Sequence, residues 1–181
     1  MIHTLFLLIY NIIRISINIC LKGNRFNVNL IQRINPWCTL RTYNNGVINI
    51  RRNNEIEFGC DIQVHSKGGL YIGKNTYMNR YCMISCHESI KIGEGCMFGP
   101  GVKIFDNNHK YDNINGVNSE LNTAPIEIGN HCWIASDVVI LKGVKIGDNC
   151  IIGAGCIIVD DVPANTLVRQ KNNLVFSPIN K

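Results

Sequence analysis

Several features that mark other protein classes are missing from this 181-residue sequence. No two of its nine cysteines form a C-x-x-C pair, which argues against a zinc site. So many unpaired thiols favour a reducing, cytoplasmic environment. No run of lysine and arginine is present, so the net charge of +5 does not indicate nucleic-acid binding. The hydrophobic fraction of 46% excludes a disordered chain, and the length predicts one domain.

The sequence also lacks a clear membrane span. Residues 1–22 are apolar in part, but a transmembrane helix needs about 20 nearly uninterrupted apolar residues, and polar residues break this run at Asn11, Arg14, Ser16 and Asn18. No small-x-small cleavage site follows, as a signal peptide would require. We expect a helix that packs against the body of the protein. The alternative is a helix on the membrane surface, which would place the protein at the inner face of the membrane.

A six-residue period organises the sequence between residues 128 and 162. The isoleucines of this period are Ile128, Ile134, Ile140, Ile146, Ile152 and Ile158. A small or β-branched residue lies four positions after each of these isoleucines: Cys132, Val138, Val144, Cys150, Cys156 and Val162. A step of six residues turns about 600° around an α-helix, so these side chains would spread over all faces of a helix. The period is instead typical of stacked short strands with isoleucine pointing inward.

The same period extends back to residue 48 in sets of three, separated by small insertions. The earlier members are Ile50, Ile56, Ile62, Ile72, Met78, Ile84, Ile92, Phe98 and Ile104. Three hexapeptides per set predict a triangular coil of about 18 residues per turn. Six cysteines fall at its small inward sites, where a free thiol behaves as a small hydrophobe: Cys60, Cys82, Cys96, Cys132, Cys150 and Cys156.

The sequence therefore predicts an all-β parallel β-helix over residues 48–162. A helical and irregular cap over 1–47 precedes it, and a tail over 163–181 follows it. Within the tail, Leu174–Phe176 is expected to form a short strand that covers the open end of the coil.

Two places depart from the period. Glu88 falls on an inward site, where a carboxylate is costly unless it is paired. We expect the insertion near Ser89 and Ile90 to turn Glu88 outward. Residues 110–125 are polar and have no period, which predicts a loop extruded from the coil, and such loops are usually functional.

His109 is the last residue before this loop. An imidazole titrates near neutral pH, so histidine is the usual general base for activating a hydroxyl or an amine. A surface histidine that caps a turn is the alternative interpretation. Asp106 lies three residues away along an extended segment, which makes it a poor candidate for orienting the imidazole.

The order of coil, histidine, protruding loop and the segment IEIGNHCWIASDVVILKGVKIGDNCIIGAGCII resembles the hexapeptide-repeat acyltransferases. The resemblance covers about residues 56–165. It is greatest to galactoside and maltose O-acetyltransferases and to the sugar O-acetyltransferases of polysaccharide biosynthesis. It implies a left-handed parallel β-helix and a homotrimer, with active sites at subunit interfaces and acetyl-CoA in a groove between neighbouring coils. The implied reaction is acetyl transfer to a sugar hydroxyl of a capsule or surface polysaccharide.

The resemblance also assigns roles to individual positions. His109 matches the catalytic base of the family. The implied acceptor-binding residues are Asn79, Glu120 and His87, the last standing where the family carries a carboxylate. The implied cofactor-binding residues are Trp133, Ser136, Ala154, Arg169 and Lys171. The last two replace a G-x-P-[AC]-[KR]-V-I motif that is missing here, and would contact the phosphates of coenzyme A.

Other functions stay open from the sequence. One is an N-acetyltransferase acting on an amino sugar. A serine acetyltransferase is another, although that class normally carries a larger helical domain before the coil. A γ-type carbonic anhydrase would need interfacial zinc-binding histidines; His65 and His87 occupy equivalent places in successive coils, but no third histidine continues the column. A non-enzymatic scaffold would leave His109, Trp133 and the long loop unexplained.

Overall fold

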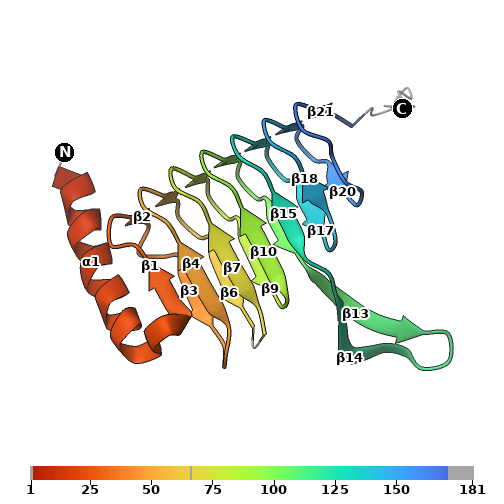
Figure 1. Ribbon diagram of the computed structural model, residues 1–181, viewed down its shortest axis with the longest axis horizontal. Helices are drawn as coiled ribbons and strands as arrows, with labels where there is room; N and C mark the ends of the chain where they lie inside the picture. Colours follow the sequence, from red (N-terminus) through yellow and green to blue (C-terminus); the bar gives the residue numbers. More distant parts are fainter. Residues whose placement is uncertain (1, 66, 171–181) are drawn as a thin grey trace, which may run out of the picture.

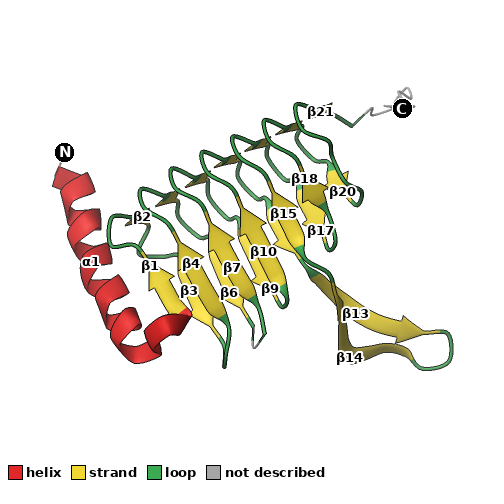
Figure 2. Cartoon of the chain, viewed as in Figure 1, coloured by secondary structure: helices red, strands yellow, loops and turns green. Residues whose placement is uncertain are grey.

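The protein is a three-sided coil of short parallel strands with one helix at its N-terminal end (Figures 1 and 2). The computed structural model describes residues 2–65 and 67–170. Each turn of the coil adds one strand to each of three parallel sheets, which have six, seven and six strands. The predicted all-β parallel β-helix is confirmed.

The three sheets are named A, B and C in the order in which a turn visits them. Sheet A contains β1 (Phe26–Val28), β4 (Val47–Ile50), β7 (Gly69–Ile72), β10 (Ser89–Ile92), β15 (Ile126–Ile128) and β18 (Lys145–Ile146). Sheet B contains β2 (Arg33–Ile34), β5 (Glu55–Ile56), β8 (Tyr77–Met78), β11 (Met97–Phe98), β16 (Trp133–Ile134), β19 (Ile151–Ile152) and β21 (Leu167–Val168). Sheet C contains β3 (Thr39–Thr42), β6 (Asp61–Val64), β9 (Met83–Cys86), β12 (Lys103–Phe105), β17 (Val139–Leu141) and β20 (Ile157–Ile158).

The core consists of the inward side chains, stacked turn upon turn. Ile134 pairs with Ile152 in the next turn of sheet B, and Ile128 pairs with Ile146 in sheet A. All four are buried. Along each strand, these inward-facing residues alternate with residues that face outward. Full burial of one such side chain contributes about 1.5–3 kcal/mol. The six cysteines predicted at inward sites are buried and free.

The coil begins earlier than the sequence predicts. β1 pairs with β4 in the register Phe26 to Ile48, and β2 and β3 complete a full turn within the segment expected to be an irregular cap. The six-residue period is present there, in Val28, Ile34 and Leu40, but Gln32 occupies the small site. Gln32 is buried because its side chain bonds the carbonyl of Arg51 and the amide of Asn54.

At two positions that the six-residue period assigns to the interior, the side chain is exposed instead. Glu88 is exposed, as expected from the insertion beside it. The other position is Asn108, four residues after Ile104 and so at a small inward site of the period; Asn108 is exposed, and Asp106 is buried in its place. At the other end of the chain, β21 continues sheet B past residue 162. The expected strand at 174–176 lies outside the described residues.

The segment between β12 of sheet C and β15 of sheet A is a β-hairpin. Its polar sequence had predicted an irregular loop. It consists of β13 (Asn107–Asp112) and β14 (Gly116–Thr123), which pair antiparallel. Figure 1 shows the hairpin projecting away from the coil. The extruded segment is therefore confirmed, and its structure is more regular than predicted.

The helix α1 (Ile2–Lys22), followed by a short 3-10 turn η1 (Gly23–Arg25), lies against β1 and β2. By length and composition the stretch Thr4–Arg25 is long and apolar enough to cross a membrane, with a mean hydropathy of 1.8. By this criterion, the polar residues within the stretch do not exclude a membrane-spanning helix.

Candidate active site

The root of the hairpin is fixed by Asp106, which is fully buried between β12 and β13. Its carboxylate accepts hydrogen bonds from the backbone N–H groups of His87, Glu88 and Ser89, at 2.8–3.0 Å. The Asn107 side-chain amide donates a further bond at 3.2 Å. These donors compensate the cost of burying a charge. Asp106 therefore ties the hairpin to the turn before it, and its carboxylate serves this purpose rather than the imidazole of His109.

His109 lies on β13 with its ring exposed. Its Nδ1 atom is 3.1 Å from the carbonyl oxygen of Asn118, on the opposite strand of the hairpin. A carbonyl oxygen can only accept, so Nδ1 carries the hydrogen in this contact. In the neutral ring the lone pair is then on Nε2, which is the arrangement that a general base requires.

Glu120 lies on β14 of the same hairpin and pairs with Lys110 at 2.9 Å. Hydrogen bonding and charge attraction from Lys110 lower the pKa of Glu120, so this carboxylate stays ionised at neutral pH. The structure thus brings Glu120 and His109, both predicted site residues, onto one exposed element.

His87 lies beside the hairpin root, since its backbone N–H bonds Asp106. Its ring stacks on that of His65 with centroids 3.9 Å apart, and His65 stacks in turn on Tyr43 at 4.8 Å. Burial, and then the neighbouring His65, lower the pKa of His87, while Asp106 opposes this. These effects favour the neutral form of the His87 imidazole. The expected stacking of the two histidines is present, and within residues 2–65 and 67–170 no group of three potential ligands could hold a metal ion.

The predicted cofactor residues form a second group, along sheet B. Trp133 on β16 is 49% exposed and lies between Met97 and Ile151 of the adjacent turns. Ser136 follows in the bend toward sheet C, and its carbonyl accepts the N–H of Gly155 at 2.9 Å. This bond places Ala154 beside Ser136 in the next turn.

Two further predicted residues belong to this side of the coil. Asn79 follows β8 of sheet B and is half-buried, with its side-chain oxygen bonded to the N–H of Arg80. Arg169 follows β21 and lies one turn beyond Ala154, close to Gly153. Lys171 lies outside the described residues.

The predicted site is therefore divided between two parts of the prism. His109, Glu120 and His87 lie where sheet C gives way to sheet A, whereas the second group follows sheet B and its bend into sheet C. Among the described residues, none of three surface depressions is lined by members of both groups.

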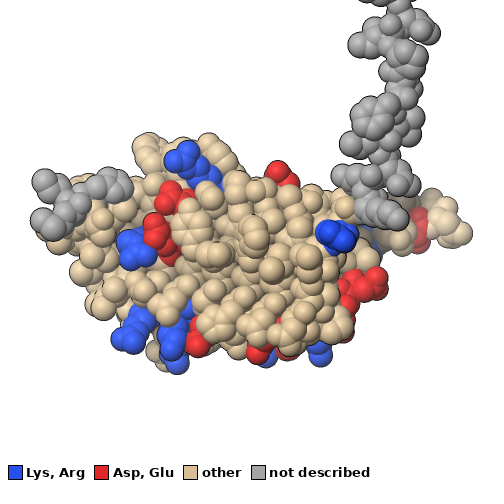
Figure 3. Space-filling view, turned by 90° about the horizontal axis from the view of Figure 1, so that it is seen from above, with Lys and Arg blue, Asp and Glu red and all other residues tan. Residues whose placement is uncertain are grey.

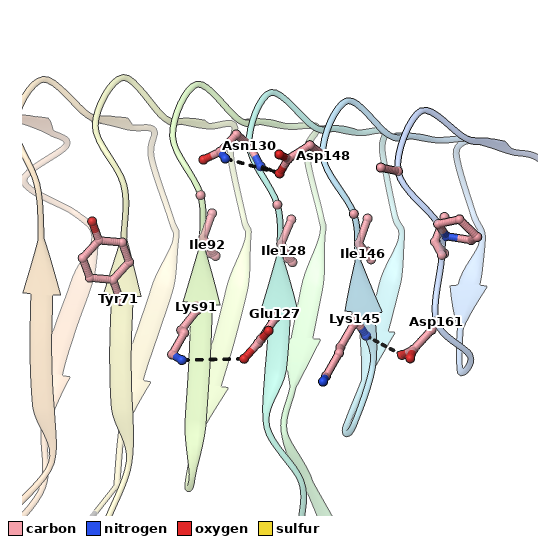
Figure 4. Close-up of a pocket in the computed structure, with 16 residues that line it drawn as sticks. Tyr71, Lys91, Ile92, Glu127, Ile128, Asn130, Lys145, Ile146, Asp148 and Asp161 are labelled. Atoms are coloured by element: carbon pink, nitrogen blue, oxygen red, sulfur yellow. Dashed lines mark hydrogen bonds and ion pairs between the residues drawn. The ribbon is translucent and has the colours of Figure 1, made fainter.

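A depression of about 630 Å³ lies on sheet A and contains none of the predicted site residues (Figure 4). Four of its polar side chains contact one another in two pairs: Lys91 with Glu127 at 3.6 Å, and Asn130 with Asp148 at 3.3 Å. We assign no chemistry to it, because it holds neither an unpaired acid–base pair nor a nucleophile.

The sequence pattern did not reveal two partners within the hairpin. One is the backbone carbonyl of Asn118, which orients His109. A contact made by the backbone cannot be recognised from the type of residue. Lys110 had a detectable signal, since its charge is opposite to that of Glu120 and the two lie within one extruded segment.

Comparison with known proteins shows which proteins this chain is similar to. Residues 125–160 match the bacterial transferase hexapeptide (six repeats) family. The chain is 39% identical to galactoside O-acetyltransferase of Escherichia coli over 111 residues, which is 61% of this chain and 55% of that protein. It is 27% identical over 140 residues to WbbJ of Escherichia coli, described provisionally as a lipopolysaccharide biosynthesis O-acetyl transferase; the match covers 72% of this chain and 70% of that protein.

Solved structures agree. A galactoside acetyltransferase in complex with coenzyme A superposes with a TM-score of 0.55 at 30% identity, covering 70% of this chain and 58% of the other. A maltose O-acetyltransferase from Clostridium difficile superposes with a TM-score of 0.50 at 27% identity, covering 72% and 64%. The chain is therefore similar to hexapeptide-repeat acetyltransferases, including galactoside and maltose O-acetyltransferases. The chain spans little more than half the length of several of these relatives.

Proposed function

We propose that the protein transfers an acetyl group from acetyl-CoA to a hydroxyl group of a sugar. The observation that carries this proposal is the contact between His109 Nδ1 and the Asn118 carbonyl, which leaves Nε2 as an acceptor on an exposed hairpin. The hairpin extends from a coil that resembles a coenzyme A-bound galactoside acetyltransferase.

In the proposed reaction Nε2 of His109 accepts the proton of the sugar hydroxyl as its oxygen attacks the thioester carbonyl. The tetrahedral intermediate then collapses, the carbon–sulfur bond breaks, and the proton passes to the departing thiolate. A positioned general base of this kind contributes roughly 10²–10⁴-fold. Holding both substrates at one place contributes the remainder.

The second group of residues suits the thioester arm. Trp133 offers an exposed aromatic face, and Ser136 and Ala154 leave room along the edge of the coil. Arg169 adds a positive charge one turn further, where phosphates of coenzyme A would lie. We assign Asn79, His87 and Glu120 to the acceptor, because their amide, imidazole and carboxylate groups hydrogen-bond hydroxyls.

We infer a homotrimer in which sheet B of one copy faces sheet C of the next. Both sheets present exposed apolar side chains, such as Met97 and Trp133 on sheet B and Ile157 on sheet C. On sheet A the outward residues include Lys91, Glu127 and Lys145 instead. Figure 3 shows a surface on which charged side chains lie mainly at the margins. A head-to-tail contact between two different sides of a prism generates a ring when its rotation closes.

We assign the acceptor to a cell-surface polysaccharide or its precursor. This rests on the similarity to galactoside O-acetyltransferase and to WbbJ, whose name refers to lipopolysaccharide biosynthesis. The test is release of free thiol from acetyl-CoA across sugar acceptors, including polymeric and lipid-linked ones.

A pair of variants makes this test specific. His109→Ala should lower turnover by roughly 10²–10⁴-fold. Tyr111→Ala, an exposed residue two positions along the same strand, should retain turnover and report on the fold of the hairpin. Turnover of His109→Ala close to that of the wild type would reject the proposed base, and failure of every sugar acceptor would reject the proposed substrate class.

A further inference from the structure

The helix α1 has the reverse of the usual arrangement of polar and apolar faces. The side chains that point away from the coil are apolar and between 51% and 75% exposed: Leu5, Phe6, Ile9, Ile13, Ile17 and Leu21. The side facing the coil carries the polar residues Asn11, Arg14 and Asn18, together with Ile15. A helix on the surface of a water-soluble domain normally turns its apolar stripe toward the core.

The inward polar residues are used to hold the helix on the coil. The Asn11 amide, which is fully buried, donates to the carbonyls of Leu7 at 2.8 Å and Ile34 at 3.0 Å. The Arg14 guanidinium donates to the carbonyl of Cys38 at 2.7 Å. Asn11, Arg14 and Asn18 therefore interrupt the apolar run in the sequence without interrupting the outward face of the helix.

The charge of this end of the molecule has one sign. Residues 1–54 contain seven Lys and Arg and no Asp or Glu, which leaves 11 Lys and Arg against 13 Asp and Glu in the rest of the sequence. Arg51 and Arg52 are exposed and border a depression of about 820 Å³ together with Ile19 and Phe26, next to the helix. Neither arginine takes part in an ion pair among the described residues, whereas Lys74 in the same depression pairs with Glu94.

We propose that the outward face of α1 docks on the surface of an anionic lipid bilayer. The apolar side chains enter the boundary between headgroups and acyl chains, and Arg51 and Arg52 lie at the level of the lipid phosphates. Apolar burial combined with a basic patch is the pair of signals that gives stable surface binding. A second copy of this helix fits the face less well, because it would bring together two segments, residues 1–54 of each copy, whose charged side chains are all Lys and Arg.

The helix lies on the bilayer rather than crossing it. Its bonds to Ile34 and Cys38 hold it along the end of the coil, as Figure 1 shows. A crossing helix would carry Arg14 and the first strands into hydrocarbon, where unpaired sheet edges and charges are costly.

The first test is co-sedimentation of the full chain with vesicles of phosphatidylcholine alone and of phosphatidylcholine mixed with phosphatidylglycerol. We expect binding to the anionic vesicles and much weaker binding to the neutral ones. Ile13→Asp, in the middle of the outward face, should abolish binding. Ile114→Asp, an equally drastic change at the exposed tip of the hairpin, should leave it unchanged.

The second test isolates the charge. Changing Arg51 and Arg52 to Gln should weaken binding to anionic vesicles by about fivefold per cation, while Lys145→Gln on the far part of sheet A should not. Cys20, exposed on the outward side of α1, gives an independent readout. Bound vesicles should slow its labelling by a water-soluble maleimide.

Three results would overturn the proposal. Equal binding of wild type and Ile13→Asp would exclude the outward face. Retention of the protein on vesicles after washing in alkaline carbonate would indicate a crossing helix. Absence of vesicle binding together with a lower oligomeric state of Ile13→Asp would assign the face to a second copy. None of these results depends on acetyl transfer, so each is separable from a failure of the proposed function.

Discussion

His109 and Trp133 lie on different sides of the same prism, one on the hairpin that leaves sheet C and the other on sheet B. The chain folds each group of predicted site residues into place without joining them. In the proposed homotrimer the two groups would meet at a contact between subunits, and mixing inactive variants tests this directly.

Subunit mixing should restore activity to two defective proteins. His109→Ala removes the proposed base and Trp133→Ala the proposed cofactor contact, so each variant alone should be strongly impaired. If each site takes one residue from each of two chains, about one site in four is intact after unfolding and refolding of an equal mixture. Thiol release by the mixture should therefore approach about one quarter of the wild-type rate.

The control for this experiment is each variant refolded by itself, which should stay impaired. A mixture no more active than the separate variants would show that both residues act within one chain or that one of them is dispensable.

Asp106 should be the residue that positions the hairpin. Asp106→Asn removes a buried carboxylate that accepts from three backbone N–H groups, and an amide oxygen cannot replace all of these bonds. We expect a loss of about 2–4 kcal/mol in the free energy of unfolding, together with a fall in turnover. Denaturant titration and hydrogen exchange of the hairpin amides measure the two effects.

Asp112→Asn is the matched control on the same hairpin. Asp112 also accepts backbone bonds, from Ile114 and Asn115, but it is fully exposed. Its replacement should be nearly silent in stability and turnover. Equal effects of the two changes would contradict the role given to Asp106.

The stacked histidines should make stability depend on pH. Burial and the charge of His65 lower the pKa of His87, so the unfolded chain binds a proton more readily than the folded protein does. The free energy of unfolding should therefore fall as the pH drops below about 6.5. His87→Asn should lose less stability than the wild type between about pH 7.5 and about pH 5.5.

His131→Asn provides the comparison, since His131 is exposed and has a left-handed backbone that asparagine accepts. This variant should keep the wild-type slope of stability against pH. If His87→Asn keeps it too, the stacked pair does not govern acid stability.

Thiol reactivity should follow burial. All nine cysteines are free, and eight are buried, leaving Cys20 exposed. Burial also raises the pKa of the Cys86 thiol, which lowers its reactivity. A chromogenic disulfide reagent should titrate one thiol in the native protein and nine in denaturant. Cys20→Ser should remove the native signal, and several fast-reacting thiols in that variant would mean that the coil opens.

The inward side chains of the coil could be predicted because the short sequence of each strand shows which residues face the core. Ile134 and Ile152 recur at a fixed spacing, and that spacing alone places them in contact across turns. The first turn was missed because Gln32 stands at a site that the pattern reserves for a small residue. Its burial depends on bonds to Arg51 and Asn54, which lie in the next turn.

The hairpin was predicted as a protrusion but not as paired strands. Its residues are exposed on both faces, so the sequence has no alternation of polar and apolar side chains from which the strands could be predicted. The candidate base His109 was identified from its place before the protrusion and from the family resemblance. Its hydrogen bond to a backbone carbonyl on β14 exists only once the hairpin has closed.

The sequence by itself determined the prism, because a side chain's inward or outward direction along a strand is fixed by its position in the repeat. Tertiary structure decided which face of α1 meets the coil, since that depends on where Asn11 finds the carbonyl of Ile34. It also decided that the two groups of site residues lie on separate sides, because the order of sheets around the prism, and not the spacing along the chain, sets their positions.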